Sequence, residues 1–146
     1  MRLTAKSEYG LLALIDLASR WGAGPVSARE IAERQSIPPK FLEQLFVSLR
    51  KAGLVTAMRG ARGGFVLERS PSDISVLEVV EALEGPLKPT ACDGGSSCSR
   101  NQACAAASVW NRATAALRQV FDTTTLAELA GQQADMDAHG VEASQG

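Results

Sequence analysis

The three cysteines of this chain stand in one short stretch, residues 91–105, which reads ACDGGSSCSRNQACA. Cys92, Cys98 and Cys104 are each separated from the next by five residues. The residues between them are small and polar, so the stretch cannot fold by burying its own side chains. The stretch needs a bound group to order it, and three thiolates are a suitable set of ligands for a metal centre. The stretch therefore predicts a metal-binding loop.

Composition allows one domain, or a small domain with an added arm, in the 146 residues. No run of eighteen apolar residues exists, so we expect no membrane-spanning helix and no membrane partner. The first ten residues include Lys6 and Glu8 and lack an apolar signal core, which predicts a cytoplasmic protein. An odd number of cysteines in that compartment is a poor basis for disulfides.

Charge is divided unevenly between the two halves of the chain. Residues 1–69 contain eleven Lys or Arg against six Asp or Glu, a net charge of +5. Residues 70–146 contain four against ten, a net charge of −6. The basic first half indicates an anionic partner such as nucleic acid. Many solvated surfaces show a similar excess, so charge alone does not establish such a partner.

The basic half has the pattern of a helix-turn-helix motif. An amphipathic helix is expected at residues 4–21, and a capping box of Ser27 and Glu30 opens a second, shorter helix. After a turn at residues 36–38, a third helix is expected at residues 39–52, with a proline at its start. A polar outer face on this third helix is typical of a recognition helix. That face offers Lys40, Glu43, Gln44, Ser48 and Lys51.

Two short strands follow, at residues 54–58 and 64–67. The connection between them, residues 59–63, reads RGARG, and its glycines permit a tight hairpin. A narrow tip that carries Arg59 and Arg62 suits the negative potential of a DNA minor groove. A helix-turn-helix followed by such a hairpin predicts a winged helix.

The second half is expected to form helices around the cysteine stretch. A capping box at Ser75 opens one helix, and a long helix with a broad apolar stripe is expected at residues 105–121. A second copy of the chain is the expected cover for this stripe, and packing against the chain's own first half is the alternative. We expect a short helical piece at residues 126–130 and a disordered tail after it.

These elements predict a mainly α fold with three parts. Residues 1–85 form a winged helix-turn-helix DNA-binding domain with a two-stranded wing. Residues 86–132 contain the cluster-binding loop and a long C-terminal dimerisation helix. Residues 133–146 form the disordered tail.

Taken in order, these segments resemble the IscR/NsrR-type family of iron–sulfur winged-helix transcription regulators. The resemblance covers nearly the whole chain, from MRLTAKSEYGLLAL through LEQLFVSLRKAGLV and RGARGGFVL to the three cysteines. It implies a homodimer on a roughly palindromic double-stranded DNA operator, with one cluster on each subunit. It also implies that the helix with Lys40, Glu43 and Gln44 enters the major groove, and that Arg59 enters the minor groove.

The chemistry of these side chains agrees with such roles. Glu43 can accept a hydrogen bond from a cytosine amino group, Gln44 suits adenine, and Lys40 suits a phosphate or a guanine. Arg59 and Arg62 compete for the minor groove, and Arg59 is favoured. For every one of these residues the alternative is an ordinary solvated surface. Further expected contacts, largely to phosphates, involve Ser27, Arg29, Ser48, Lys51 and Gly60.

Three cysteines leave an iron–sulfur cluster one protein ligand short of four. Family members that manage cluster biosynthesis place a histidine three residues after the last cysteine, but this chain has Ala107 there. In the nitric-oxide- and redox-sensing branch, an acidic residue of the first helix supplies the fourth ligand from the partner subunit. Glu8 matches that position, although it could be a simple helix-dipole acid. Asp93, Glu33, His139 and a solvent or small thiol are the remaining options.

Several readings remain open beside this one. Three Cys ligands and one oxygen fit a 4Fe-4S or a 2Fe-2S cluster, and 4Fe-4S is favoured. A winged-helix regulator with structural zinc is a rival, but zinc sites more often use C-x2-4-C spacing and a fourth nitrogen or sulfur. A direct cysteine thiol switch is another. An enzyme is disfavoured, because no phosphate-binding loop, Ser/His/Asp set or small-molecule substrate site is present.

The sequence thus predicts a cytoplasmic, homodimeric repressor that binds DNA. Its affinity for the operator is expected to depend on the state of an iron–sulfur cluster at Cys92, Cys98 and Cys104. This cluster is expected to sense nitric oxide, redox state or iron–sulfur status.

Overall fold

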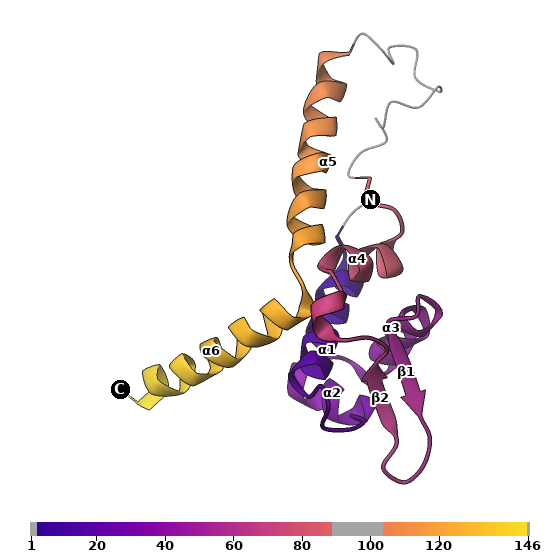
Figure 1. Cartoon of the computed structure of the whole chain (residues 1–146), viewed down its shortest axis with the longest axis vertical. Coiled ribbons are helices and arrows are strands. Elements are labelled where there is room, and N and C mark those ends of the chain that lie inside the picture. Colours follow the sequence, from indigo (N-terminus) through magenta and orange to yellow (C-terminus); the bar gives the residue numbers. More distant parts are fainter. Residues whose placement is uncertain (1–2, 89–103, 146) are drawn as a thin grey trace.

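A computed structural model describes residues 3–88 and 104–145 of the chain, with side chains up to residue 140. Helices α1 to α4 and a two-stranded wing form a head, from which α5 rises and α6 departs in another direction (Figure 1). The predicted mainly α winged helix-turn-helix fold with a long C-terminal helix is confirmed. None of the described helices is both long and apolar enough to cross a membrane.

Helices α1 (Ala5–Ser19) and α4 (Val76–Glu84) pack against each other at the side of the head that the C-terminal end of α5 reaches. Thr4 caps α1 by accepting a hydrogen bond from the Lys6 amide at 3.2 Å. The expected capping box of α4 is present, with both Ser75–Glu78 bonds formed. Gly10 allows the close approach of the two helices, because a Cβ there would collide with the Leu83 side chain.

The helix-turn-helix motif consists of α2 (Ala28–Gln35) and α3 (Pro39–Lys51). Ser27 accepts a hydrogen bond from the Glu30 amide at 3.1 Å. The Glu30 carboxylate lies 3.8 Å from Arg34, so only the serine half of the expected capping box forms. Ser36 makes the sharp turn after α2 with a left-handed φ of 54°.

The wing is an antiparallel pair of strands, β1 (Val55–Met58) and β2 (Gly64–Leu67), paired from Val55↔Leu67 to Met58↔Gly64. A short 3-10 helix, η1 (Pro71–Asp73), which was not expected from the sequence, leads from the wing to α4. The core beneath lies between α1, α3 and the wing, and its largest fully buried side chains include Phe46, Leu14, Ile31, Leu42, Leu49 and Leu54.

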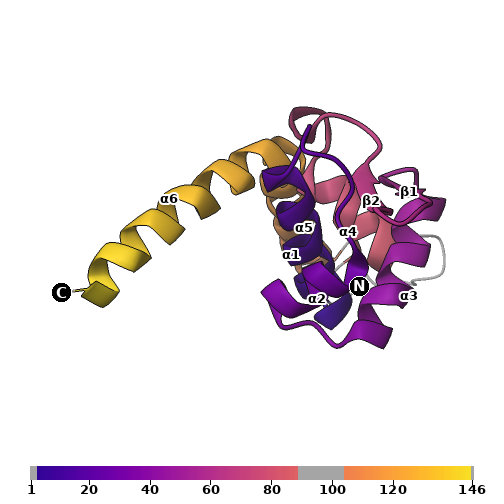
Figure 2. The same ribbon diagram turned by 90° about the horizontal axis from the view of Figure 1, so that it is seen from below.

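Helix α5 (Ala105–Thr123) has no buried residue within the single chain. The chain then returns to the head, where Leu126 is fully buried and its amide donates to the Ile74 carbonyl at 3.0 Å. Two views show that α6 extends away from the wing and from α3 (Figures 1 and 2).

Helix α6 (Leu126–Gln145) replaces the short helical piece and the disordered tail expected from the sequence. The Thr125 hydroxyl caps it by accepting from the Glu128 amide at 3.2 Å. Ala, Leu, Glu, Gln and Met are good helix formers, and no proline interrupts them. The polarity of this segment reflects a solvated helix, because most of its described side chains after Ala130 are exposed.

Candidate DNA-binding surface and cluster site

Helix α3 turns a polar face away from the core. Its opposite face is buried through Leu42, Leu45, Phe46 and Leu49. This amphipathic pattern leaves the predicted major-groove residues free to meet a partner, since Lys40, Glu43, Gln44 and Lys51 are all exposed. Their contacts with DNA remain predictions.

The outer face of α3 differs from the expected set at three residues. Ser48 is only half-buried and lies at the edge of this face, whereas Val47 and Arg50 are exposed. Val47 lies one turn after Glu43, and the spacing alone could have placed it on this face. Its apolar side chain, however, is more typical of a buried position.

The wing tip carries the predicted arginines. Arg59, Gly60 and Arg62 are all exposed. Gly60 adopts a φ of 118° that favours glycine, and its carbonyl accepts a hydrogen bond from the Gly63 amide at 3.0 Å. This tight turn presents both guanidinium groups at the end of a narrow hairpin.

Two contacts fix the wing to the head. Val26 and Phe65 exchange both backbone hydrogen bonds, at 3.0 and 2.7 Å, so the linker after α1 pairs with β2. The Phe65 ring stacks on Phe46 of α3, with centroids 4.2 Å apart and planes at 3°. The wing and the helix α3 therefore form one unit.

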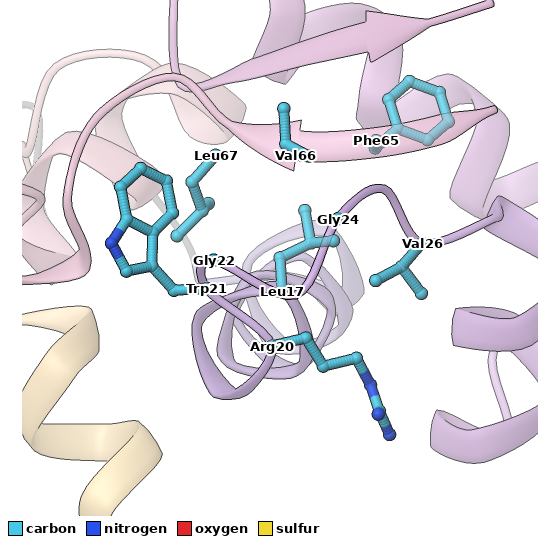
Figure 3. A pocket seen from close by; sticks show the side chains of 9 residues that line it. All are labelled: Leu17, Arg20, Trp21, Gly22, Gly24, Val26, Phe65, Val66 and Leu67. Atoms are coloured by element: carbon cyan, nitrogen blue, oxygen red, sulfur yellow. The ribbon is translucent and has the colours of Figure 1, made fainter. Parts of the chain in front are cut away.

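A cavity of about 410 Å³ lies between the end of α1 and strand β2 (Figure 3). Trp21, Leu67 and Val66 form its walls, and the Leu17 side chain points into it. The guanidinium group of Arg20 points away from these apolar side chains. The cavity is thus apolar in character.

The predicted phosphate contacts near α2 are Ser27 and Arg29. Ser27 is half-buried as the N-cap. Arg29 is exposed and pairs with Glu33 at 3.2 Å across one helical turn. Solvent-exposed pairs of this kind are weak, so Arg29 can exchange Glu33 for a phosphate at little cost.

A buried carboxylate joins α1 to the helix-turn-helix motif. Asp16 of α1 accepts two hydrogen bonds from Arg34, at 2.9 and 2.8 Å, and a third from Gln35 at 3.0 Å. Arg20 lies 3.5 Å from the same carboxylate. Burial by itself raises the pKa of Asp16, but these hydrogen bonds and the positive charges outweigh it, so the pKa lies below its ordinary value.

A second carboxylate joins the end of α4 to the start of α1. Glu84 accepts hydrogen bonds from the Thr4 amide at 2.6 Å and from the Ser7 hydroxyl at 2.9 Å. Burial raises the pKa of Glu84, but these bonds and the charge of Lys6 lower it below the ordinary value. Glu84 is the last residue of α4 and stands seven residues before the cysteine stretch 91–105 in the sequence, so these bonds hold the end of α4 against the start of α1.

Glu8 lies one turn after Thr4 on the exposed side of α1. Among the described residues, its carboxylate has no side-chain hydrogen bond or ion pair. An exposed, unpaired carboxylate has the donor chemistry of an iron ligand and is accessible to a second molecule.

Of the predicted cluster ligands, Cys92 and Cys98 lie outside the described residues. Cys104 is the N-cap residue of α5; its thiol is free and half-buried and makes no capping hydrogen bond. No three side chains of His, Cys, Asp or Glu in the described ranges lie together as a metal site. Cys104 can therefore act as a metal ligand only together with residues outside the described ranges or from a second chain.

Cys104 and Glu8 of one chain lie far apart. The 19 residues of α5 make a helix about 28 Å long, and Cys104 is at its end away from the head that contains α1 (Figure 1). If Glu8 completes the ligand set, it must therefore come from another subunit.

The other candidates for the fourth ligand are placed as follows. Asp93 lies outside the described residues. Glu33 is engaged with Arg29, and His139 lies on the exposed surface of α6 with its Nδ1 atom 2.7 Å from the Asp135 carbonyl oxygen. Ala107 occupies the first turns of α5 without any donor atom.

Comparison with known proteins agrees with this architecture. The family model of Rrf2, described as an iron-dependent transcriptional regulator, matches residues 3–132. The chain is 39% identical to the transcriptional regulator IscR of Escherichia coli over 140 residues, which cover 96% of this chain and 86% of that protein.

Two solved structures are similar throughout. CymR of B. subtilis, a global cysteine regulator, superposes with a TM-score of 0.79 at 36% identity and covers 90% of this chain and 98% of its own. IscR of T. potens gives 0.76 at 39% identity, with 91% and 88% covered. The predicted resemblance is confirmed, and this DNA-binding transcriptional regulator belongs to the Rrf2 family.

Proposed function

We propose that the chain acts as a homodimeric repressor whose operator affinity follows the state of an iron–sulfur cluster at Cys92, Cys98 and Cys104. The observation that carries the proposal is the position of Cys104, at the far end of a helix with no buried residue. Such a helix needs a partner along its length, and a partner brings a second head near the cysteines. Because DNA is the proposed partner, we place the protein in the cytoplasm. We assign it no catalytic role.

The head supports the DNA-binding part of the proposal. Helix α3 and the two wing strands lie on the same side of the molecule, opposite α6 (Figure 2). Lys40, Glu43 and Gln44 would meet base edges in the major groove, while Arg59 enters the adjacent minor groove. Arg29 and Lys51 would hold phosphates and thereby set the register.

The bare surface of α5 supports a homodimer. Val109, Trp110 and Val120 are all exposed in the single chain, and Val120 reaches 59% exposure. Large apolar side chains exposed along one helix favour an interaction surface. Pairing of two α5 helices would also set the spacing of the two recognition helices on a palindromic operator.

The cluster would be held by the three cysteines and by Glu8 of the partner subunit, with 4Fe-4S favoured over 2Fe-2S. When bound, it supplies a centre that reacts with nitric oxide and oxidants. A carboxylate oxygen is a weaker partner for iron than a thiolate, so Glu8 is the ligand expected to leave first. Because Glu84 fixes the start of α1, release of Glu8 changes how one head is held against the other subunit.

Replacement of Arg59 tests the wing assignment. We expect Arg59→Ala to weaken binding to a duplex selected from a random pool roughly tenfold, because it removes a charge from the minor groove. Arg62→Ala is the matched control and should cost about twofold or less. Fluorescence anisotropy at one fixed salt concentration measures both. Equal affinity of Arg59→Ala and wild type would show that the wing does not insert Arg59.

The cluster is tested by anaerobic purification of wild type, Glu8→Ala and a triple Cys→Ser variant. Iron and sulfide analysis should find both elements in wild type and neither in the triple variant. Mössbauer spectra should change in Glu8→Ala but not in Glu33→Ala, which removes an exposed acid from α2. A colourless wild type with one zinc per chain would remove the cluster mechanism and leave the DNA-binding function intact.

A direct thiol switch is the second candidate function. Cys104 has a free thiol, and a structural relative, CymR of Staphylococcus aureus, is known in an oxidised form. A wild type that lacks iron and sulfide but changes its DNA affinity after treatment with peroxide would favour this candidate.

A further inference from the structure

One apolar side chain stands on the polar outer face of α3. Val47 is 51% exposed, and it lies on the same side of the helix as Glu43 and Gln44, one turn earlier, and Lys51, one turn later. The buried stripe of α3 is complete without it, since Leu45, Phe46 and Leu49 fill the core on the opposite side. Packing of the head therefore does not account for a valine at this position.

The surroundings of Val47 are cationic and open. A shallow depression of about 350 Å³ on the surface of the head is lined by Val47, Arg50 and Lys51. Two cations beside an apolar group match the major groove, where phosphates flank the base edges. Around the helix axis, Val47 lies between the directions of Glu43 and Gln44, so it belongs to the face proposed to enter the groove.

The major groove offers only one apolar group of its own, the C5 methyl of thymine. A β-branched side chain presents two methyl groups with a fixed χ1 and is suited to cover that methyl. We propose that Val47 is a specificity-determining residue that recognises the methyl group of a thymine in each half-site. This inference rests on the proposed role of α3 as the recognition helix.

The position of that thymine follows from the helix geometry. Val47 lies three residues after Gln44, which is about 4.5 Å along the helix axis. Successive bases of one strand are about 3.4 Å apart. The thymine should therefore lie one or two base pairs from the base that Gln44 contacts.

The test replaces each thymine of a selected duplex, one symmetric pair at a time, by deoxyuridine, which lacks only the methyl group. The full-length protein, purified anaerobically, should lose affinity about fourfold per half-site at one thymine position, the value for one buried methyl group. In Val47→Ala that loss should fall below about twofold. Val47→Thr keeps one methyl and should retain most of the penalty, whereas Val47→Ser should lose it.

Lys51→Ala is the control that separates recognition of the methyl from general affinity. It should weaken binding to every duplex and leave the uridine penalty unchanged. The inference is overturned if, at every thymine position, replacement by deoxyuridine lowers the affinity of wild type no more than the affinity of Val47→Ala. If wild type selects and binds no duplex at all, the DNA-binding function fails first and the role of Val47 fails with it.

Discussion

Asp16→Asn is expected to lower the free energy of unfolding by about 2 to 3 kcal/mol at neutral pH. Asp16 is buried and accepts three hydrogen bonds, two of them from the Arg34 guanidinium group. Hydrogen bonds to charged groups contribute about 1.5 to 3 kcal/mol, and loss of a buried partner costs more. Arg34 is one-third exposed, so water offsets part of that loss. Urea denaturation measures the change.

The Asp16 effect should depend on pH in a defined direction. The pKa of the Asp16 carboxyl is lower in the folded protein than its ordinary value of 3.8. Its contribution is therefore fully present above about pH 5 and is lost as the pH falls through the folded pKa. Wild type and Asp16→Asn should differ at pH 7 and converge in strong acid. A difference that persists unchanged below pH 2 would contradict the ionic origin of the effect.

The matched control for Asp16 is Glu33→Gln. It removes another carboxylate with an arginine partner, but the Glu33–Arg29 pair is exposed on both sides. No measurable change in the unfolding transition is expected. A loss as large as that of Asp16→Asn would show that burial is not what distinguishes the two pairs.

Gly64→Ala is expected to destabilise the protein by about 2 to 3 kcal/mol and to weaken DNA binding as well. A Cβ on Gly64 would collide with the backbone of Val26 and Ser27, which cannot move aside as a flexible side chain could. The collision falls on the two hydrogen bonds that pair Val26 with Phe65. Thermal unfolding and anisotropy with the selected duplex measure the two effects.

Gly131→Ala is the matched control for this glycine substitution. Gly131 lies within α6, and a Cβ there meets no atom within 4 Å. Alanine favours a helix over glycine by up to about 1 kcal/mol, so this variant should be as stable as wild type or slightly more stable. If Gly64→Ala behaved in the same way, the close contact between the linker and β2 would not hold the wing.

Two carboxylates, Asp16 and Glu84, hold α1 at its two ends. Asp16 fixes the C-terminal half of α1 to α2, and Glu84 fixes its N-terminal end to α4. Glu8 lies between them. A rigid helix held at both ends transmits a displacement at one end to the other, which is the property that coupling of a cluster to a recognition helix requires.

Local patterns predicted most of the head correctly. The proline at the start of α3, the serines that cap α2 and α4, and the glycines of the wing act through their immediate neighbours, so the sequence shows them directly. The end of α6 was misjudged because a solvated helix and a disordered tail have similar polarity. Val47 was not predicted to lie on the exposed surface of α3, because apolar residues are usually assigned to the core.

The order of helices α1 to α5 and of the two strands, the polar face of α3, the basic wing tip and the spacing of the cysteines can all be predicted from the sequence alone. These features depend on residues that are close along the chain. The tertiary structure was needed to show that Asp16 binds Arg34, that Glu84 accepts hydrogen bonds from Thr4 at the start of α1 and that Phe65 stacks on Phe46. Those contacts join residues separated by between 18 and 80 positions. No helical or strand period encodes them, because they arise only when the packing of the core brings the elements together.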